Sequence, residues 1–169
     1  MLNLNNYLGK ELKIVQNSIW KSEFHLLDEQ NVIGKLYSVK IWKNLYNCEF
    51  DNKTIEFYKK NIFGQEVFIK EKNKSLPFAS FESNFFFTSG ELKLDRGRKL
   101  LIKIGTFKNN ASLYDSDKLL ILINCKLSFK EKCIVTIENK SEFFENYPWL
   151  PFFIFYLTNT SKNTGVTFS

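Results

Sequence analysis

Lysines occur in small groups where the sequence pattern predicts turns or strand ends. These candidate binding residues are Lys59, Lys60, Lys70, Lys72, Lys126, Lys130 and Lys132. A lysine ammonium close to an anionic membrane adds about 1 kcal/mol to binding. Phe63 and Phe129 lie in the same predicted turns and would add rings beside the charges. The pattern therefore indicates a candidate surface for an anionic ligand or membrane. Solvated lysines at turns are the alternative interpretation, and the more common one for such a pattern.

The chain is basic, but arginine supplies little of the charge. It has 24 Lys and Arg against 18 Asp and Glu, which gives a formal net charge of +6, and Arg96 and Arg98 are the only arginines. Dedicated phosphate and nucleic-acid sites usually recruit arginine, because its planar fork binds phosphate in a bidentate way. Aromatic residues between lysines can stack bases, but no signature of a nucleic-acid-binding fold is present. The sequence therefore favours an anionic membrane surface or a protein partner over nucleic acid.

The chain offers few groups for catalysis or metal binding. His25 is the only histidine, and no second His or Cys is placed to form a metal site or a catalytic triad with it. The glycines are dispersed, and Asp95–Arg98 has the composition of a tight turn rather than a phosphate loop. Five carboxylates could meet in space for acid–base work, although their spacing does not require it: Glu82, Glu91, Asp95, Asp115 and Asp117. We therefore predict a non-enzymatic protein with no metal or other cofactor.

The three cysteines are Cys48, Cys125 and Cys133, and none forms a CxxC motif. The segment Met1–Tyr7 lacks the charged start and apolar block of a secretion signal. A small, odd number of cysteines without such a signal is typical of a reducing compartment. We predict a cytoplasmic protein, peripheral at the membrane if the lysines bind lipid. Cys125 and Cys133 could face each other across a hairpin, but two buried reduced thiols are favoured.

The fold that must position these residues is predicted to be all-β for most of the chain. Apolar residues make up 44% and charged residues 25% of the 169 residues, as in an ordinary soluble domain. From about residue 11 to residue 138, short alternating or apolar runs are separated by turn signals. The runs are Glu11–Gln16, Ser22–Asp28, Val32–Tyr37, Tyr46–Phe50, Thr54–Tyr58, Gln65–Lys70, Phe78–Glu82, Gly90–Leu94, Lys99–Ile104, Ala111–Tyr114, Leu119–Ile123 and Cys133–Ile137. This spacing is typical of a barrel or sandwich, and no linker interrupts it, so we predict one domain over residues 1–169.

One aromatic segment near the C-terminus breaks the strand pattern. Residues Trp149–Leu157 are all apolar or proline. Pro148 and Pro151 fit the first turn of a helix, where N–H groups lack partners anyway. We predict a helix over about residues 147–160 that is apolar on every face and therefore buried. Membrane insertion and an exposed interaction helix are the alternatives, but a membrane span needs about 20 apolar residues, so no span is predicted. The predicted core residues are Trp149, Leu150, Phe152, Phe153, Phe155 and Tyr156.

A β-rich chain that ends in one wholly apolar helix resembles the tubby C-terminal-like superfamily. That group includes the tubby domains, the plant LURP-one-related proteins and the phospholipid scramblases. The resemblance covers roughly residues 12–162 and rests on three segments: the Trp20–Asp28 hairpin, the Asn61–Gly64 turn, which is in keeping with small bacterial members, and Tyr147–Leu157. It implies a closed antiparallel barrel of about twelve strands around a central helix. Such a wide barrel needs its lumen filled, and a wholly apolar helix fits that requirement.

The lysines and the resemblance together lead to one function prediction and two alternatives. We predict a non-enzymatic, tubby-like barrel that binds anionic phospholipid or another anionic ligand. The first alternative is a structural or protein–protein interaction module that holds a protein partner. The second is a cryptic enzyme, which would need a deep pocket lined by convergent carboxylates and His25.

Overall fold

The strands form one closed ring in the computed structural model, which describes residues 2–18, 22–40, 44–60, 65–105, 109–126 and 131–163. The strands are β1 (Glu11–Ser18), β2 (Glu23–Asp28), β3 (Asn31–Lys40), β4 (Leu45–Phe50), β5 (Lys53–Tyr58), β6 (Glu66–Glu71), β7 (Ala79–Ser83), β8 (Ser89–Lys93), β9 (Lys99–Ile104), β10 (Asn110–Asp115), β11 (Lys118–Cys125) and β12 (Glu131–Ile137). Short 3₁₀ helices occupy Leu4–Tyr7 (η1) and Asp95–Gly97 (η3), and two α-helices follow the strands, α1 (Phe143–Asn146) and α2 (Leu150–Asn163). Each predicted run overlaps one of the twelve strands.

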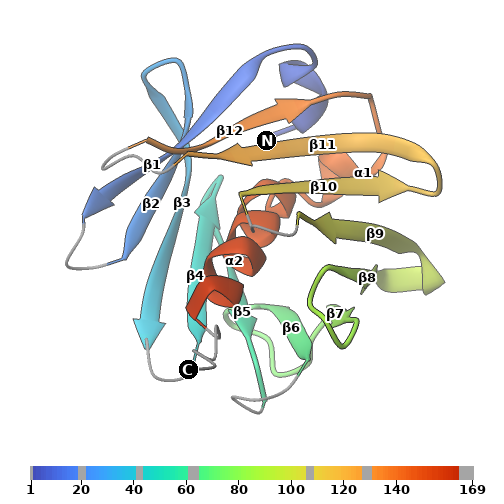
Figure 1. The fold of residues 1–169 in the computed structure, drawn as a ribbon. Coiled ribbons are helices and arrows are strands. Elements are labelled where there is room, and N and C mark those ends of the chain that lie inside the picture. Colours follow the sequence, from blue (N-terminus) through green and yellow to red (C-terminus); the bar gives the residue numbers. More distant parts are fainter. Residues whose placement is uncertain are drawn as a thin grey trace, which may run out of the picture.

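The ring closes because each strand pairs antiparallel with its sequence neighbours and β1 pairs with β12 (Figure 1). The side chains alternate between lumen and solvent, as period-two patterning requires. In β9, for example, Leu100, Ile102 and Ile104 are buried while Lys99 and Lys103 are exposed. Closure leaves no unpaired strand edge, which protects an apolar sheet from aggregation. The predicted fold class, a closed antiparallel barrel around a hydrophobic helix, is confirmed.

Helix α2 fills the lumen, and its successive residues contact different strands. The ring of Phe153 lies 5.1 Å from that of Phe57 in β5, and the ring of Phe155 lies 4.8 Å from that of Phe24 in β2. Because a helix turns about 100° per residue, a helix ringed by strands must be apolar on all sides. The six predicted core residues are all buried: Trp149, Leu150, Phe152, Phe153, Phe155 and Tyr156.

The bounds of α2 differ slightly from the predicted 147–160, because the helix begins at Leu150 rather than at residue 147. Pro151 is then its second residue, where no intrahelical hydrogen bond is lost. The hydroxyls of Thr158 and Thr160 are buried, and each donates to a carbonyl of the preceding turn, at 2.7 and 2.8 Å. Helix α1 was not predicted. Among the described residues, no helix combines the length and the apolar character needed to cross a bilayer.

The prediction of reduced thiols at Cys125 and Cys133 is wrong. The register of β11 and β12 places the two residues directly opposite each other, and their sulfurs form a disulfide. The alternating pattern predicts two adjacent strands but not their register, which decides whether the cysteines meet. Cys48 is a buried free thiol, and burial holds its pKa well above the usual value. Cytoplasmic localisation therefore loses the support of the cysteines and stays a prediction.

Candidate functional site

The alternating strand directions give the barrel two ends. We call the end where α2 begins the proximal end and the end where α2 finishes the distal end. The turns β2–β3, β4–β5, β6–β7, β8–β9 and β10–β11 lie at the proximal end, and the opposite strand ends lie at the distal end. Trp149, just before α2, lines a pocket with Asp95 of the β8–β9 turn. Thr160, near the end of α2, lines a small cavity with Lys59 and Phe87.

Three of the candidate lysines lie at the distal end. Lys59 and Lys60 follow β5, and Lys126 follows β11. Lys130 lies outside the described residues, and only the backbone of Lys132 is described, within β12. Phe63 and Phe129 also lie outside the described residues. The described distal lysines therefore come from two separate strand ends.

The other two candidate lysines lie at the proximal end. Lys70 is close to the end of β6, and Lys72 is in the turn that follows. The Lys70 ammonium lies 2.9 Å from a carboxylate oxygen of Glu56 and donates to the carbonyl of Lys74 at 3.3 Å. This ammonium is already satisfied, which makes Lys70 a poor candidate for holding an external anion. The candidate lysines whose side chains are described thus belong to both rims, not to one surface.

Lys59 and Lys60 have different surroundings. Lys59 is half-buried beside a cavity of about 20 Å³ that Leu157 and Thr160 also line, and burial lowers its pKa. Lys60 is exposed, with its ammonium 4.4 Å from the ring centroid of Phe68. A cation over an aromatic face is attracted by the ring but keeps its charge. Neither ammonium pairs with a carboxylate of the described residues, so both remain available to an external anion.

The loop between β7 and β8 displays two phenylalanines to solvent at the distal end. Phe85 is 77% exposed and Phe86 is 76% exposed, with ring centroids 5.4 Å apart in an edge-to-face arrangement. The Asn84 side chain holds the loop, because its oxygen accepts from the backbone N–H of Thr88 at 2.9 Å and of Ser89 at 3.3 Å. Its amide also donates to the Thr88 hydroxyl at 2.9 Å. The two rings are therefore presented by a hydrogen-bonded loop rather than by a free segment.

The third phenylalanine of this loop turns the other way. Phe87 has a φ of 55°, in the left-handed region that non-glycine residues rarely adopt, and it lines the same cavity as Lys59. Its N–H donates to the Asn84 carbonyl at 3.1 Å. The inward ring of Phe87 anchors the loop and leaves its two neighbours outside. Three consecutive Phe in the polar stretch Ser83–Ser89 are the signal in the sequence for this feature, which was not predicted.

The two ends differ in charge as well as in exposed apolar surface. Among the described residues outside the strands, the distal end carries lysines and no carboxylate: Lys59, Lys60 and Lys126. The corresponding proximal turns contain both signs, with four carboxylates: Glu29, Asp51, Asp95 and Asp117. The described loops of the distal end are therefore positive, while the carboxylates closest in sequence to the Phe pair, Glu82 and Glu91, belong to strands β7 and β8.

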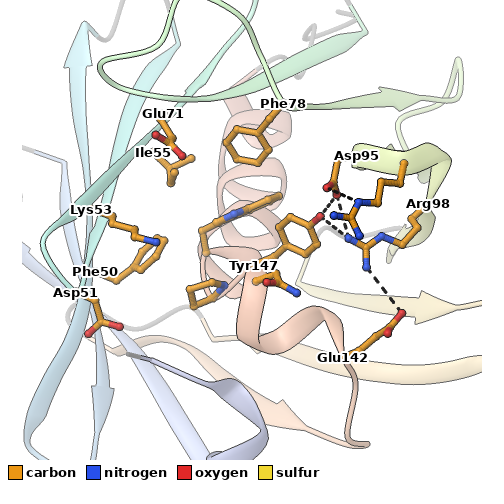
Figure 2. Close-up of a pocket in the computed structure, with 14 residues that line it drawn as sticks. Phe50, Asp51, Lys53, Ile55, Glu71, Phe78, Asp95, Arg98, Glu142 and Tyr147 are labelled. Carbon is orange, nitrogen blue, oxygen red and sulfur yellow. Dashed lines mark hydrogen bonds and ion pairs between the residues drawn. The ribbon is translucent and has the colours of Figure 1, made fainter.

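The proximal end contains a pocket of about 520 Å³ beside the start of α2 (Figure 2). Its floor is apolar, formed by rings around the chain that leads into α2: Phe50, Phe78, Tyr147 and Trp149. Its walls carry three cations and four carboxylates: Lys53, Arg96, Arg98, Asp51, Glu71, Asp95 and Glu142. Both arginines of the chain lie here. We call this the proximal pocket.

Arg98 is the most connected side chain of the proximal pocket. One of its terminal nitrogens, Nη2, lies 3.0 Å from Asp95 Oδ1 and donates to the Tyr147 hydroxyl at 2.9 Å. The Tyr147 hydroxyl in turn donates to Asp95. The guanidinium also faces the ring of Phe143, at 5.1 Å from its centroid. These contacts join η3 to the chain between α1 and α2, segments about fifty residues apart in sequence.

The same contacts set the ionisation of the cluster. The hydrogen bond from Tyr147, and then that from Arg98, lowers the pKa of Asp95. Burial, reinforced by the bond to Asp95, raises the pKa of Tyr147 to about 12. Tyr147 is therefore a neutral donor at physiological pH and not a general base. The cluster fixes the pocket wall and offers binding groups rather than a nucleophile.

The remaining candidates for chemistry do not gather around one pocket with His25. His25 lies on β2, where its Nε2 is 2.7 Å from a carboxylate oxygen of Glu23, and it does not line the proximal pocket. Glu82 and Glu91 lie opposite each other on β7 and β8, but each is paired with a lysine: Glu82 with Lys93 at 2.7 Å and Glu91 with Lys99 at 3.0 Å. No group of three or more metal-ligating side chains occurs among the described residues.

The chain matches no known protein-family profile, no curated protein and no solved structure. The likeness to the tubby C-terminal-like superfamily therefore stays a prediction.

Proposed function

We propose that the protein is a non-enzymatic binding barrel that docks with its distal end on anionic phospholipid membranes. The observation that carries the proposal is the β7–β8 loop, which holds Phe85 and Phe86 in solvent at the end whose described loops contain lysines and no carboxylate. Exposed aromatic pairs that a loop holds in place are unusual in soluble proteins unless they bind something. The likeness to a superfamily that includes phospholipid scramblases supports the same conclusion.

Two signals are needed for such docking, because one alone gives marginal membrane affinity. Burying a Phe ring in the acyl boundary contributes at most about 1.5–3 kcal/mol. Each lysine near an anionic surface contributes about 1 kcal/mol, and salt screens this attraction. The Phe pair and the exposed ammoniums of Lys60 and Lys126 supply one signal each.

The sequence that links the other distal strand ends has a similar composition. These short stretches lie outside the described residues and contain no Asp or Glu. They include Trp20, Trp42, Phe107 and Phe129, and each of these four is followed directly by lysine. Aromatic and basic residues are the types that favour a membrane interface.

The proposal is tested by co-sedimentation with vesicles of phosphatidylcholine containing about 30% phosphatidylserine, with pure phosphatidylcholine vesicles as the comparison. We expect binding to the anionic vesicles that weakens as salt rises from about 0.1 M to about 1 M. The double variant Phe85→Ala, Phe86→Ala should bind at least about tenfold more weakly. The double variant Lys60→Gln, Lys126→Gln should bind roughly tenfold more weakly at low salt and be less sensitive to salt.

Matched control variants come from the proximal end. Leu76 is 77% exposed, as exposed as Phe85, and lies in the β6–β7 turn. Leu76→Ala and Lys72→Gln should therefore bind the vesicles as the wild type does. The proposal would be refuted if the wild type did not bind the anionic vesicles at low salt. It would also be refuted if the proximal and distal variants lost vesicle binding to the same extent.

A further inference from the structure

The proximal pocket lies at the end of the barrel opposite the proposed membrane surface and has a different chemical character. Its walls carry both signs of charge, whereas a site for a polyanion such as a phosphoinositide would exclude carboxylates. Its volume of about 520 Å³ falls within the usual range for small-molecule sites. These features favour a small ligand that itself carries both charges and an apolar group.

One wall can bind the anionic group of such a ligand. The Nη1 nitrogen of Arg98 lies 3.8 Å from Glu142, beyond hydrogen-bond distance, while Nη2 is held by Asp95 and Tyr147. Arg98 is therefore fixed in place and has donors left over. Arg96 is 87% exposed, and its Nε lies 4.0 Å from Asp95, which is too long for a hydrogen bond. Its guanidinium is therefore also available to a ligand carboxylate. Two guanidinium groups on one turn suit a carboxylate, which they can hold by charge-assisted hydrogen bonds.

The opposite wall can bind the cationic group. Glu71, at the end of β6, is exposed and makes no ion pair with the described residues. Figure 2 shows Glu71, Ile55 and Lys53 across the pocket from Arg98, so this wall carries one cation as well as its carboxylates. Asp51 on the same side already accepts a hydrogen bond from the backbone N–H of Leu2. Glu71 is therefore the carboxylate with free capacity for an ammonium group.

The floor between these walls is apolar. The ring of Phe78 lies 5.9 Å from that of Trp149, and the ring of Tyr147 lies 5.7 Å from that of Trp149. Phe78 is only partly buried, whereas the rings beneath it are almost fully buried. A ligand side chain resting on this floor would cover apolar surface between the two charged walls.

We propose that the proximal pocket binds a short peptide with free termini, with its carboxylate at Arg96 and Arg98, its ammonium at Glu71 and an apolar side chain on the ring floor. An extended tripeptide spans roughly 10 Å, so its two charged termini are far apart and can be bound by different side chains. This inference does not depend on membrane docking, because none of the residues that carry it lies at the distal end.

The test uses four tripeptides that differ only in their terminal charges: Ala-Phe-Ala with free termini, its N-acetylated form, its C-amidated form and the form blocked at both ends. Binding to the full chain is measured by calorimetry and by NMR line broadening. We expect the free peptide to bind at least about tenfold more tightly than either singly blocked form, since a charge-assisted hydrogen bond contributes about that much. The doubly blocked form should bind more weakly still.

Variants then assign each terminus to a wall. In the Arg96→Gln variant, amidation of the peptide should weaken binding by less than about threefold. Acetylation should weaken binding by the same factor as in the wild type. In Glu71→Gln the pattern should reverse. Lys35→Gln and Glu11→Gln, exposed charges outside the pocket, are the controls and should keep the wild-type preferences.

Several results would overturn the inference. It fails if the four peptides bind equally, if none binds, or if the acetylated peptide binds as tightly as the free one, which would indicate a simple anion site. It also fails if Arg96→Gln and Glu71→Gln weaken all four peptides by the same factor. Vesicle binding by the same variants should be unchanged, so failure of this inference and failure of membrane docking are distinguishable.

Discussion

Truncation of Phe153 should destabilise the barrel more than any exposed substitution of similar size. Its side chain is fully buried, and its ring centroid lies 5.1 Å from that of Phe57 in β5 and 5.8 Å from that of Phe81 in β7. Phe→Ala in a packed core costs about 3–5 kcal/mol, and ring pairs of this geometry add about 0.5–1.5 kcal/mol each, not additively. We therefore expect Phe153→Ala to lower the free energy of unfolding by about 4–5 kcal/mol. Phe155→Ala, whose ring meets Phe24, should cost about 3–5 kcal/mol.

The assay is urea unfolding followed by circular dichroism. With a slope of about 2 kcal/mol per molar urea, the Phe153→Ala midpoint should fall by roughly 2 M. Phe86→Ala removes the same atoms from an exposed site and should stay within about 0.5 kcal/mol of the wild type. If Phe153→Ala were as stable as Phe86→Ala, helix α2 would not be the packed centre of the barrel.

Three further changes test separate parts of the structure. Cys125→Ser removes the cross-link to Cys133, a residue eight positions away in sequence. It should lower the free energy of unfolding by roughly 2–3 kcal/mol. Equal stability of the wild type with and without reductant would contradict this expectation. Because the pKa of Tyr147 is raised to about 12 from its ordinary value of 10, the unfolded chain releases this proton first, and stability is lost as pH rises through that interval. The stability advantage of the wild type over Tyr147→Phe should therefore shrink by on the order of 2 kcal/mol between pH 9 and 12, and a constant difference would contradict the burial of the hydroxyl. A Cβ at Gly90 would lie 2.3 Å from the Phe81 ring and 2.5 Å from a backbone oxygen, so Gly90→Ala should cost about 1–3 kcal/mol in thermal unfolding, whereas Ser89→Ala should not.

The strands and the central helix could be predicted because their signals are local. Period-two alternation is visible in a run such as Lys99–Ile104, and the apolar block Trp149–Leu157 has no polar face to expose. The closed ring was what the tubby-like resemblance implied, and a helix that is apolar on every face is consistent with it. The helix starts three residues later than predicted because Pro148 and Pro151 each fit several positions of a first turn.

The sites could not be predicted to the same extent because they depend on residues far apart in sequence. Asp95 and Tyr147 meet across 52 residues, and only the closed ring with α1 and α2 brings them together. The opposed cysteines depended on strand register, which alternation leaves open. The division of the lysines between two rims depended on knowing which turns share an end. The Phe85–Phe86 pair is visible in the sequence, but composition alone does not show whether such rings are exposed or buried.

The central claim is that the distal end, and not the proximal end, enters the surface of an anionic membrane. An environment-sensitive fluorophore on Phe86→Cys and, separately, on Leu76→Cys compares two positions that are 76% and 77% exposed at opposite ends of the barrel. Cys48 is fully buried and the other two cysteines are cross-linked, so the label goes to the introduced thiol. On addition of phosphatidylserine-containing vesicles, the account predicts a blue shift and increased emission at position 86 and no change at position 76. Equal responses at both positions, or none at position 86 while the protein is bound to the vesicles, would contradict it.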